Sequence, residues 1–271
     1  MVISGSALRH AIVGPVGSAD GPMRTNRAAW ETASEKYVRE YDRLLEEART
    51  GQTLADAELA VLGSILSQRP VVVHLQSGHG LDDIALARAG AQRVVGVDYS
   101  TVATSSAARR ARELTMPCHY VVAALPPTPL VDGCADLVYT GKGALIWMPD
   151  IQAWARDVAR LLHPGGHLLV HEAHPMVPLY SWNPEMTVIR PDRSHFSRSH
   201  VNDTYPAGGA LEWQWTLGEI VTAIAEADLE LLTLIEHPEP FWRPGNIDAA
   251  AWNGQLPNSY SLLARRRPGV G

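Results

Sequence analysis

The stretch VVVHLQSGHGLDDIAL, residues 71–86, decides the fold of this chain. Its first five residues are almost wholly apolar, which is typical of a strand buried on both faces of a parallel sheet. Gly78 and Gly80 follow, and residues without a side chain let the backbone turn sharply and approach a ligand closely. The next residues open a helix, whose first amide groups would face the same ligand. We therefore expect a ligand site at the carboxyl end of this strand.

The same alternation of strand and helix continues along the chain. Apolar strands are predicted over residues 93–97, 118–122, 135–140 and 167–173, with helical or loop segments between them. Strands that alternate with helices pair in parallel through right-handed crossovers. Two last strands, 229–237 and 259–265, are expected to pair antiparallel at the end of the sheet. The prediction is an α/β fold, a Rossmann-like, doubly wound, seven-stranded and mainly parallel sheet.

One domain accounts for nearly the whole chain. Residues 1–22 carry Gly, Ser and Pro without periodicity and are expected to form a loose tail, as are residues 268–271, so that the domain spans 23–267. A helical pattern covers 24–50. Residues 176–213 hold prolines, aromatics and polar residues without a clear helix. A segment of that length is more often functional than a plain loop, so we expect a cap inserted after the fifth strand.

The composition narrows the class of protein. Hydrophobic residues make up 46% and charged residues 19% of 271 residues, as in ordinary globular proteins. The net charge of −6 argues against a nucleic-acid partner, which needs a basic face. No run of residues is apolar and long enough for a membrane span, the start is no convincing signal peptide, and the two cysteines lack metal-ligand spacing. The expected location is the cytoplasm, and a homodimer is compatible with the sequence.

An acidic residue ends the second predicted strand. Asp98 stands 18 residues after Gly80, where a carboxylate can accept two hydrogen bonds from a ribose diol. Dinucleotide sites have G-x-G-x-x-G, whereas this chain has Asp83 at the third glycine position, and a carboxylate there would repel a pyrophosphate. The pattern favours a nucleoside cofactor without phosphate, such as S-adenosylmethionine, over NAD or FAD.

Four segments together resemble the class I S-adenosylmethionine-dependent methyltransferases. They are HLQSGHG (74–80), VVGVDYS (94–100), ADLVYTGKGAL (135–145) and LLHPGGHLLV (161–170). More narrowly, NRAAWETASEKYVREYDRLL (26–45), GKGALIWMPD (141–150), HEAHP (171–175) and LPNSYSLLARR (256–266) resemble bacterial small-molecule methyltransferases. The similarity covers residues 24–265.

The resemblance implies which residues hold S-adenosylmethionine, and its product S-adenosylhomocysteine. The glycine-rich loop would support the methionine part, Asp98 the ribose, and the next two residues and the loop after the third strand the adenine. These cofactor-binding residues are Leu75, Gln76, Ser77, Gly78, Gly80, Asp98, Tyr99, Ser100, Ala124, Leu125, Thr140, Gly141 and Lys142. His74 stands where the family often has an acid, and no acid follows the third strand.

The helical segment 24–50 resembles a lid over the cofactor. Trp30 and Tyr37 would then bind it too, because aromatic faces attract a sulfonium cation. An aromatic stripe packed onto the sheet explains the same residues equally well. Lys142 is open to two interpretations, steering of an anionic substrate or a solvated charge.

A general base is sought at the end of the fifth strand, where substrate sites of open α/β sheets lie. His174 could deprotonate a hydroxyl or amine as the methyl group arrives, and Glu172 is the second candidate; His195 and His200 in the insert could do the same. His171 and His174 stand three apart and tend to project to opposite faces, so no metal site is predicted.

The function that the resemblance implies is methyl transfer to an O, N or C nucleophile of a small molecule, such as a secondary metabolite. Two other classes stay open: a cofactor-binding enzyme of this fold with a cyclase-like activity, and a non-catalytic binding protein. A nicotinamide dehydrogenase is the weaker enzymatic alternative, because of Asp83.

Overall fold

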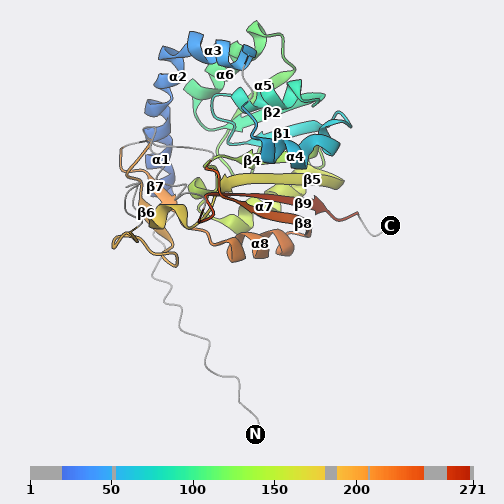
Figure 1. Cartoon of the computed structure of the whole chain (residues 1–271). Coiled ribbons are helices and arrows are strands. Elements are labelled where there is room, and N and C mark those ends of the chain that lie inside the picture. Colours follow the sequence, from blue (N-terminus) through green and yellow to red (C-terminus); the bar gives the residue numbers. More distant parts are fainter. Residues whose placement is uncertain (1–19, 51–52, 181–187, 207, 241–254, 269–271) are drawn as a thin grey trace.

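The sheet has seven strands, in the order β3-β2-β1-β4-β5-β9-β8 (Figure 1). The computed structural model describes residues 20–50, 53–180, 188–206, 208–240 and 255–268. The first five strands run parallel, and β9 pairs antiparallel with both β5 and β8. The strands are β1 (Val71–Leu75), β2 (Arg93–Asp98), β3 (Cys118–Val122), β4 (Ala135–Gly141), β5 (Leu162–Ala173), β8 (Leu229–His237) and β9 (Ser259–Arg266). The predicted fold class is confirmed.

Helices pack on both faces of this sheet, and the residue-by-residue alternation of the strands divides the core between them. Val72 and Leu137 belong to one buried cluster, with α3 (Tyr41–Thr50), α4 (Asp56–Leu66) and α5 (Leu81–Arg88). Their chain neighbours Val73 and Val138 belong to the other, with α7 (Ile151–Leu161) and α8 (Leu217–Glu226). Because successive side chains of a strand point to opposite faces, a strand covered on both sides must be apolar throughout.

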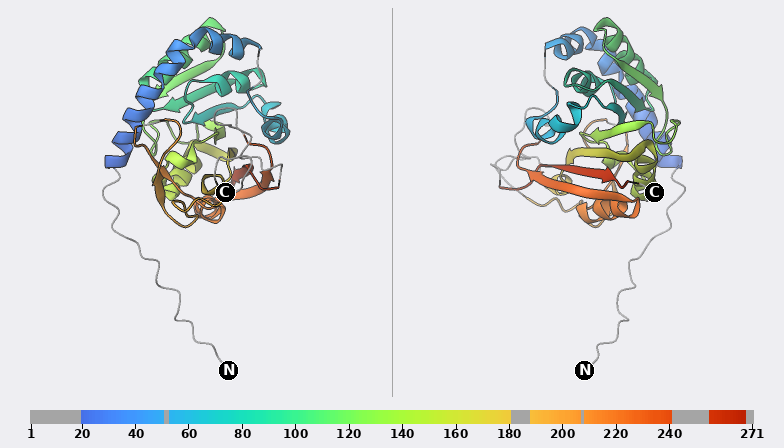
Figure 2. Two further views of the ribbon diagram at one scale, coloured as in Figure 1. Left: turned by 60° about the vertical axis from the view of Figure 1, so that its left-hand side comes forward. Right: turned by 90° about the vertical axis from the view of Figure 1, so that its right-hand side faces the viewer.

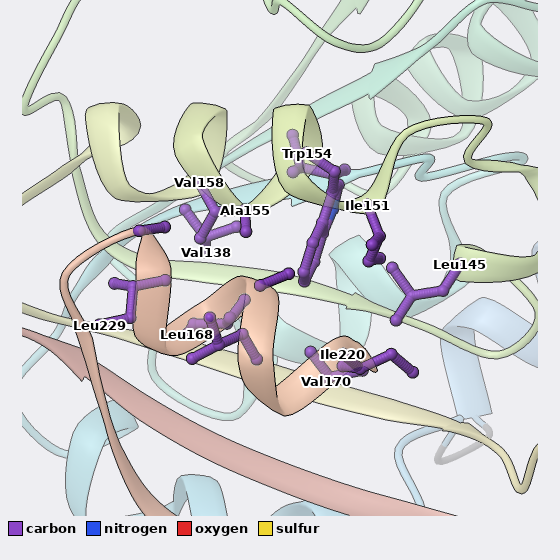
Figure 3. Close-up of a cluster of buried hydrophobic side chains, with 14 of the residues drawn as sticks. Val138, Leu145, Ile151, Trp154, Ala155, Val158, Leu168, Val170, Ile220 and Leu229 are labelled. Carbon is purple, nitrogen blue, oxygen red and sulfur yellow. The ribbon is translucent and has the colours of Figure 1, made fainter. Parts of the chain in front are cut away.

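Figure 3 shows the second of these clusters, between α7, α8 and the strands β4 and β5. Trp154 of α7 is 1% exposed and stands among Val138, Leu168 and Ile220. Asp150 begins the helix, since its carboxylate accepts the amide N–H of Ala153 at 2.8 Å. This cluster anchors the carboxyl ends of β4 and β5, from which the loops at the site depart.

Three consecutive helices replace the single helix predicted over 24–50. They are α1 (Asp20–Ala33), α2 (Glu35–Arg39) and α3. In Figure 2, α1 (blue) runs along one side of the molecule, and its first turns lie beside the insert. The Asn26 side chain ties the two together, because its amide donates to Leu211 O and its oxygen accepts Leu211 N–H, both at 2.8 Å. The remaining described helix between strands, α6 (Thr101–Glu113), connects β2 to β3.

The insert after β5 contains a short antiparallel hairpin. Its strands β6 (Ser199–Val201) and β7 (Leu211–Trp213) pair His200 directly with Glu212. Figure 1 shows the hairpin next to α1, at the end of the sheet where the parallel strands finish. The prediction of a domain spanning 23–267 with tails and a cap stays a prediction, and the tail 1–22 lies almost wholly outside the described residues. Among the described helices, none has the length and hydropathy that a membrane crossing requires.

Candidate functional site

The glycine-rich loop between β1 and α5 is held in a left-handed backbone conformation. Gln76, Gly78 and Gly80 have φ of 59°, 55° and 79°. At Gly80 an added Cβ would stand 2.5 Å from the Tyr120 hydroxyl, so only glycine fits. At Gly78 the same Cβ would meet nothing within 4 Å, so this turn of the loop borders open space.

Asp98 joins this loop to the end of β2. Its Oδ2 accepts the Gly78 N–H at 3.0 Å and its Oδ1 accepts the Ser100 N–H at 2.8 Å. Burial raises the pKa of the Asp98 carboxyl, while these two bonds lower it. Both bonds leave lone pairs on the carboxylate oxygens, which is what the two hydroxyls of a ribose require. The loop and Asp98 were predicted to meet, and the structure brings them together.

Two orphaned polar atoms belong to the glycine-rich loop. Gln76 Oε1 and Ser77 Oγ are buried and have no hydrogen-bond partner among the described residues. The Gln76 amide donates to Ala144 O at 2.8 Å and so spans from the first loop to the loop after β4. Buried acceptors without donors are costly unless a ligand supplies the donors. The ammonium group of an amino acid is such a donor, so the loop fits the methionine part of the implied cofactor.

The other predicted cofactor residues line the same edge in different ways. The Thr140 hydroxyl lies 3.4 Å from Leu75 O and connects β4 to β1. Ala124 is exposed, whereas the Leu125 side chain is buried in the core, so Leu125 can offer a ligand only its main chain. Gly141 packs against the His171 main chain, where an added Cβ would stand 2.2 Å from the carbonyl oxygen. Tyr99 follows Asp98 and is partly exposed.

Asp83 points into the core and not towards the loop. Its Oδ1 lies 2.6 Å from His74 Nδ1, and the Asp83 side chain is fully buried. The expected repulsion between Asp83 and a phosphate is therefore wrong for this structure, because the carboxylate is turned away and paired. The missing third glycine still changes how closely α5 can approach β1. His74, at the family's usual acidic position, is engaged in this same pair.

The aromatic residues of the first helices face the loop and the insert. The Tyr37 ring stacks on His79 with centroids 4.2 Å apart and an interplanar angle of 5°. Trp30 packs edge-on against Trp147 at 5.6 Å and Tyr205 at 5.5 Å. Both predicted residues line the cavity described below, and their role as a lid over the cofactor stays a prediction.

Lys142 is neither a free charge nor a solvated one. Its ammonium group lies 2.8 Å from Asp82 Oδ1, 3.2 Å from Glu58 Oε2 and 2.8 Å from Thr53 O. Burial favours the neutral amine, but the Asp82 and Glu58 carboxylates hold the pKa of Lys142 above its ordinary value. Glu58 is fully buried and also accepts the Tyr139 hydroxyl. Lys142 therefore ties α4 and α5 to the loop after β4.

Both carboxylate oxygens of Glu172 accept hydrogen bonds from main-chain amides. Oε2 accepts the Gly143 N–H at 2.8 Å, and Oε1 accepts those of Ala144 and Leu145 at 2.5 and 2.8 Å. Burial raises the pKa of Glu172 and these bonds oppose that rise. The catalytic role predicted for Glu172 stays a prediction. Its hydrogen bonds indicate instead that Glu172 positions the loop after β4.

Both nitrogens of His174 lie close to other groups of the protein. Nδ1 accepts the Met176 N–H at 3.2 Å, and Nε2 lies 2.9 Å from Glu236 Oε1, without the alignment of a hydrogen bond. Nε2 is sealed from solvent, and burial lowers the pKa of His174 although Glu236 raises it. A proton released by a methyl acceptor therefore has no direct route to either nitrogen of His174. The role of His174 as a base stays a prediction that this geometry does not favour.

His171 gives the first testable prediction. It is 2% exposed, and burial, with the positive charge of Lys142 nearby, lowers its pKa from 6.5 to about 4. The unfolded chain therefore takes up a proton between these values while the folded protein does not. By linkage, stability should fall by about 3 kcal/mol as the pH drops from 6.5 to 4. Urea unfolding at several pH values should show this slope flattened in His171→Gln.

The exposed His119 on β3 supplies the control for this measurement. His119→Gln should leave the slope of stability against pH as in the wild type. The same slope in His171→Gln and the wild type would show that His171 does not resist protonation. The remaining sources of the slope would then be the other histidines whose pKa burial lowers, namely His79, to about 4, His167 and His174.

A cavity of about 720 Å³ runs from the glycine-rich loop to the insert. His79 and Gly143 border it at the cofactor end, and His200 and Glu212 at the insert end. Its apolar walls include Trp30, Leu145, Trp147, Val177, Trp213, Trp215 and Ile220. A mostly apolar cleft with a few converging polar groups is the usual form of a small-molecule site.

Sequence reasoning missed the buried partners in this site. Glu58 and Glu212 were not singled out, since a glutamate on a helix or beside two tryptophans reads as a surface residue. His200 was noted only as one histidine of the insert, because no pattern fixes the register of two three-residue strands nine residues apart. Among the described residues no group of three or more potential ligands could hold a metal ion.

Comparisons with known proteins agree with this geometry. Residues 72–166 match a family model described as a methyltransferase domain. An S-adenosylmethionine-dependent methyltransferase from Mesorhizobium loti is 23% identical, with a TM-score of 0.60, and the alignment covers 78% of this chain and 99% of that one. Geranyl diphosphate C-methyltransferase from Streptomyces coelicolor, in complex with S-adenosyl-L-homocysteine, is 16% identical, with a TM-score of 0.54 and coverage of 77% and 79%.

The [4+2]-cyclase SpnF is also similar, with 16% identity, a TM-score of 0.54 and coverage of 88% of this chain and 96% of that one. No curated protein matches in sequence. The structural likenesses show the fold, and the family model shows the domain that contains the glycine-rich loop and Asp98. This chain has the class I S-adenosylmethionine-dependent methyltransferase fold, and its residues 72–166 match the model of a methyltransferase domain.

Proposed function

We propose that this protein binds S-adenosylmethionine and transfers its methyl group to a small-molecule acceptor. The observation that carries the proposal is the cavity, which reaches the glycine-rich loop at His79 and extends past Trp147 to the insert residues His200 and Glu212. A binding protein without catalysis would need only the first part. When bound, the cofactor supplies an electrophilic methyl group on a sulfonium.

The chain's own residues would then bind and orient the cofactor and the acceptor, and exclude water from them. Asp98 would hold the ribose, and the Gln76 and Ser77 oxygens the ammonium group. Tyr37 and Trp30 would close the site from α1 and α2. Positioning and the exclusion of water supply most of the rate acceleration in such a displacement, because the leaving group is a neutral thioether.

The test is titration calorimetry with S-adenosylmethionine, S-adenosylhomocysteine and NAD. We expect the first two to bind and NAD not to bind. Binding of NAD alone, or of none of the three, would refute the proposal.

A cyclase-like activity is the second candidate, because the cyclase SpnF shares the fold. The two activities differ in what the cofactor must contribute. A methyltransferase stops when S-adenosylhomocysteine replaces S-adenosylmethionine, whereas a cyclase that only binds the cofactor continues. Product analysis by mass spectrometry, with either cofactor, separates them.

A further inference from the structure

A histidine–glutamate pair stands in the wall of the acceptor cavity. His200 on β6 and Glu212 on β7 are direct cross-strand neighbours, and His200 Nε2 lies 2.8 Å from Glu212 Oε2. Each side chain is 12% exposed, and both border the cavity. A carboxylate accepts, so Nε2 carries the proton and Nδ1 holds the free lone pair.

The second oxygen of Glu212 is also occupied. Oε1 accepts the side-chain amide of Asn202, whose own oxygen accepts the Thr204 N–H at 3.0 Å. The carboxylate is thus fixed from two sides, and it fixes the imidazole in one tautomer. His200 Nδ1 has no hydrogen bond from the described residues and is not sealed from solvent. This is the arrangement of an oriented general base.

The hairpin itself does not require this pair. Removing a carboxylate from water costs several kcal/mol, and two apolar side chains at the same cross-strand position would stabilise a hairpin as well. The pair also lines a cavity whose apolar walls include four tryptophans. A costly polar pair at the edge of an apolar cavity points to the ligand that the cavity holds.

The other carboxylates and histidines at the cavity are less suited to act as a base. Glu40 and Glu47 pair with Arg43, and Asp203 pairs with Arg190 and Arg193. Glu172 holds main-chain amides, and His174 Nε2 is sealed. Burial lowers the pKa of His79 to about 4, which makes it a weak base. His200 differs from these groups, because its Nδ1 has a free lone pair and its Nε2 is hydrogen-bonded to the Glu212 carboxylate.

We infer that His200 is the general base of this enzyme, that Glu212 and Asn202 position it, and that the acceptor is an aromatic hydroxyl compound. The inference rests on the proposed function. An aromatic amine attacks with a lone pair that it already has, whereas a hydroxyl must lose its proton as it attacks. The aromatic walls suit a planar ring, so a phenol matches both features of the cavity.

The step balances in atoms and charge. The phenol oxygen forms a bond to the sulfonium methyl carbon, and the carbon–sulfur bond breaks with its electron pair on sulfur. The phenol proton moves to His200 Nδ1, and Glu212 stabilises the resulting imidazolium. The proton then leaves to water, and the products are an aryl methyl ether and a neutral thioether.

The experiment uses S-adenosylmethionine with 2-naphthol, 4-phenylphenol and 4-nitrophenol at pH 8, where only the last is already ionised. We expect the wild type to methylate the first two, and His200→Gln to lower kcat for them by about 10²-fold or more. The loss with 4-nitrophenol should be much smaller, because no proton remains to be removed. A purely structural role would lower all three rates alike.

The matched control is His163→Gln, since His163 and Asp136 form another histidine–carboxylate pair, at 2.7 Å, away from the cavity. It should leave all rates unchanged. Glu212→Gln should cause a smaller loss than His200→Gln, and nitrogen NMR should show His200 losing its single Nε2–H tautomer. Unchanged calorimetric binding of S-adenosylmethionine in each variant shows that the fold is intact.

Three results would overturn the inference. One is no methylation of any of the three phenols while S-adenosylmethionine binds. Another is an equal loss in His200→Gln for ionised and un-ionised phenols, and the third is no loss at all. Absence of cofactor binding in the wild type would instead refute the proposed function, so the two failures are distinguishable.

Discussion

Asp98→Ala should weaken the binding of S-adenosylmethionine by about 10²- to 10⁴-fold. The wild-type carboxylate can accept two hydroxyl hydrogen bonds from a ribose, and each bond to a charged group contributes about 1.5–3 kcal/mol. The carboxylate is already oriented by the Gly78 and Ser100 amides, so little ordering is needed on binding. Calorimetric titration of both proteins measures the effect directly.

Asp98→Asn refines this measurement. Asparagine keeps one acceptor oxygen and loses the charge, so its loss of affinity should lie between wild type and alanine. Asp132→Asn, at a side chain that is 79% exposed, is the control and should bind as the wild type does. If Asp98→Ala and the wild type bound S-adenosylmethionine with equal affinity, Asp98 would not be the residue that binds the ribose.

Lys142→Met should destabilise the fold by about 3–5 kcal/mol. The substitution removes the cation between Asp82 and Glu58 and leaves the fully buried Glu58 carboxylate without its counter-charge. Breaking a buried pair costs more than the pair itself contributes, because one charge stays desolvated. The midpoint of denaturant unfolding should fall, and this is measured by circular dichroism.

Lys36, the other lysine of the chain, provides the matched control. Its side chain is 49% exposed and its nitrogen lies 3.9 Å from Glu40, so Lys36→Met should change stability by no more than about 1 kcal/mol. Adding Glu58→Gln to Lys142→Met should restore part of the loss, because the uncompensated charge is then gone. A Lys142→Met protein as stable as the wild type would show that the network is not tightly coupled.

The fold could be predicted because its signals are local. The run VVVHL is apolar at each position but one, and a strand with both faces covered needs that pattern. The predicted bounds of 71–75, 118–122 and 229–237 coincide with β1, β3 and β8. The helix predicted over 24–50 was wrong in its continuity, because a helical pattern does not show where the chain bends between Ala33 and Tyr41.

The glycine-rich loop could also be predicted from the sequence. Glycines mark where the backbone takes a left-handed φ, and Asp98 ends a recognisable strand. Gln76 shows the limit, since it adopts a φ of 59° without being glycine. Side-chain partners did not follow from the sequence, so Lys142 was left open between two interpretations, neither of which describes its pairing with Asp82 and Glu58.

The sequence by itself determined the parallel sheet, the glycine-rich turn and the acidic residue at the end of β2, because each depends on residues that are neighbours in the chain. Tertiary structure alone decided which charges are paired and which face the cavity. His200 meets Glu212 across a hairpin, and Lys142 meets Glu58 from 84 residues away in the chain. Hydrogen bonds and burial act over a few ångströms in space, and the distance along the chain does not enter them.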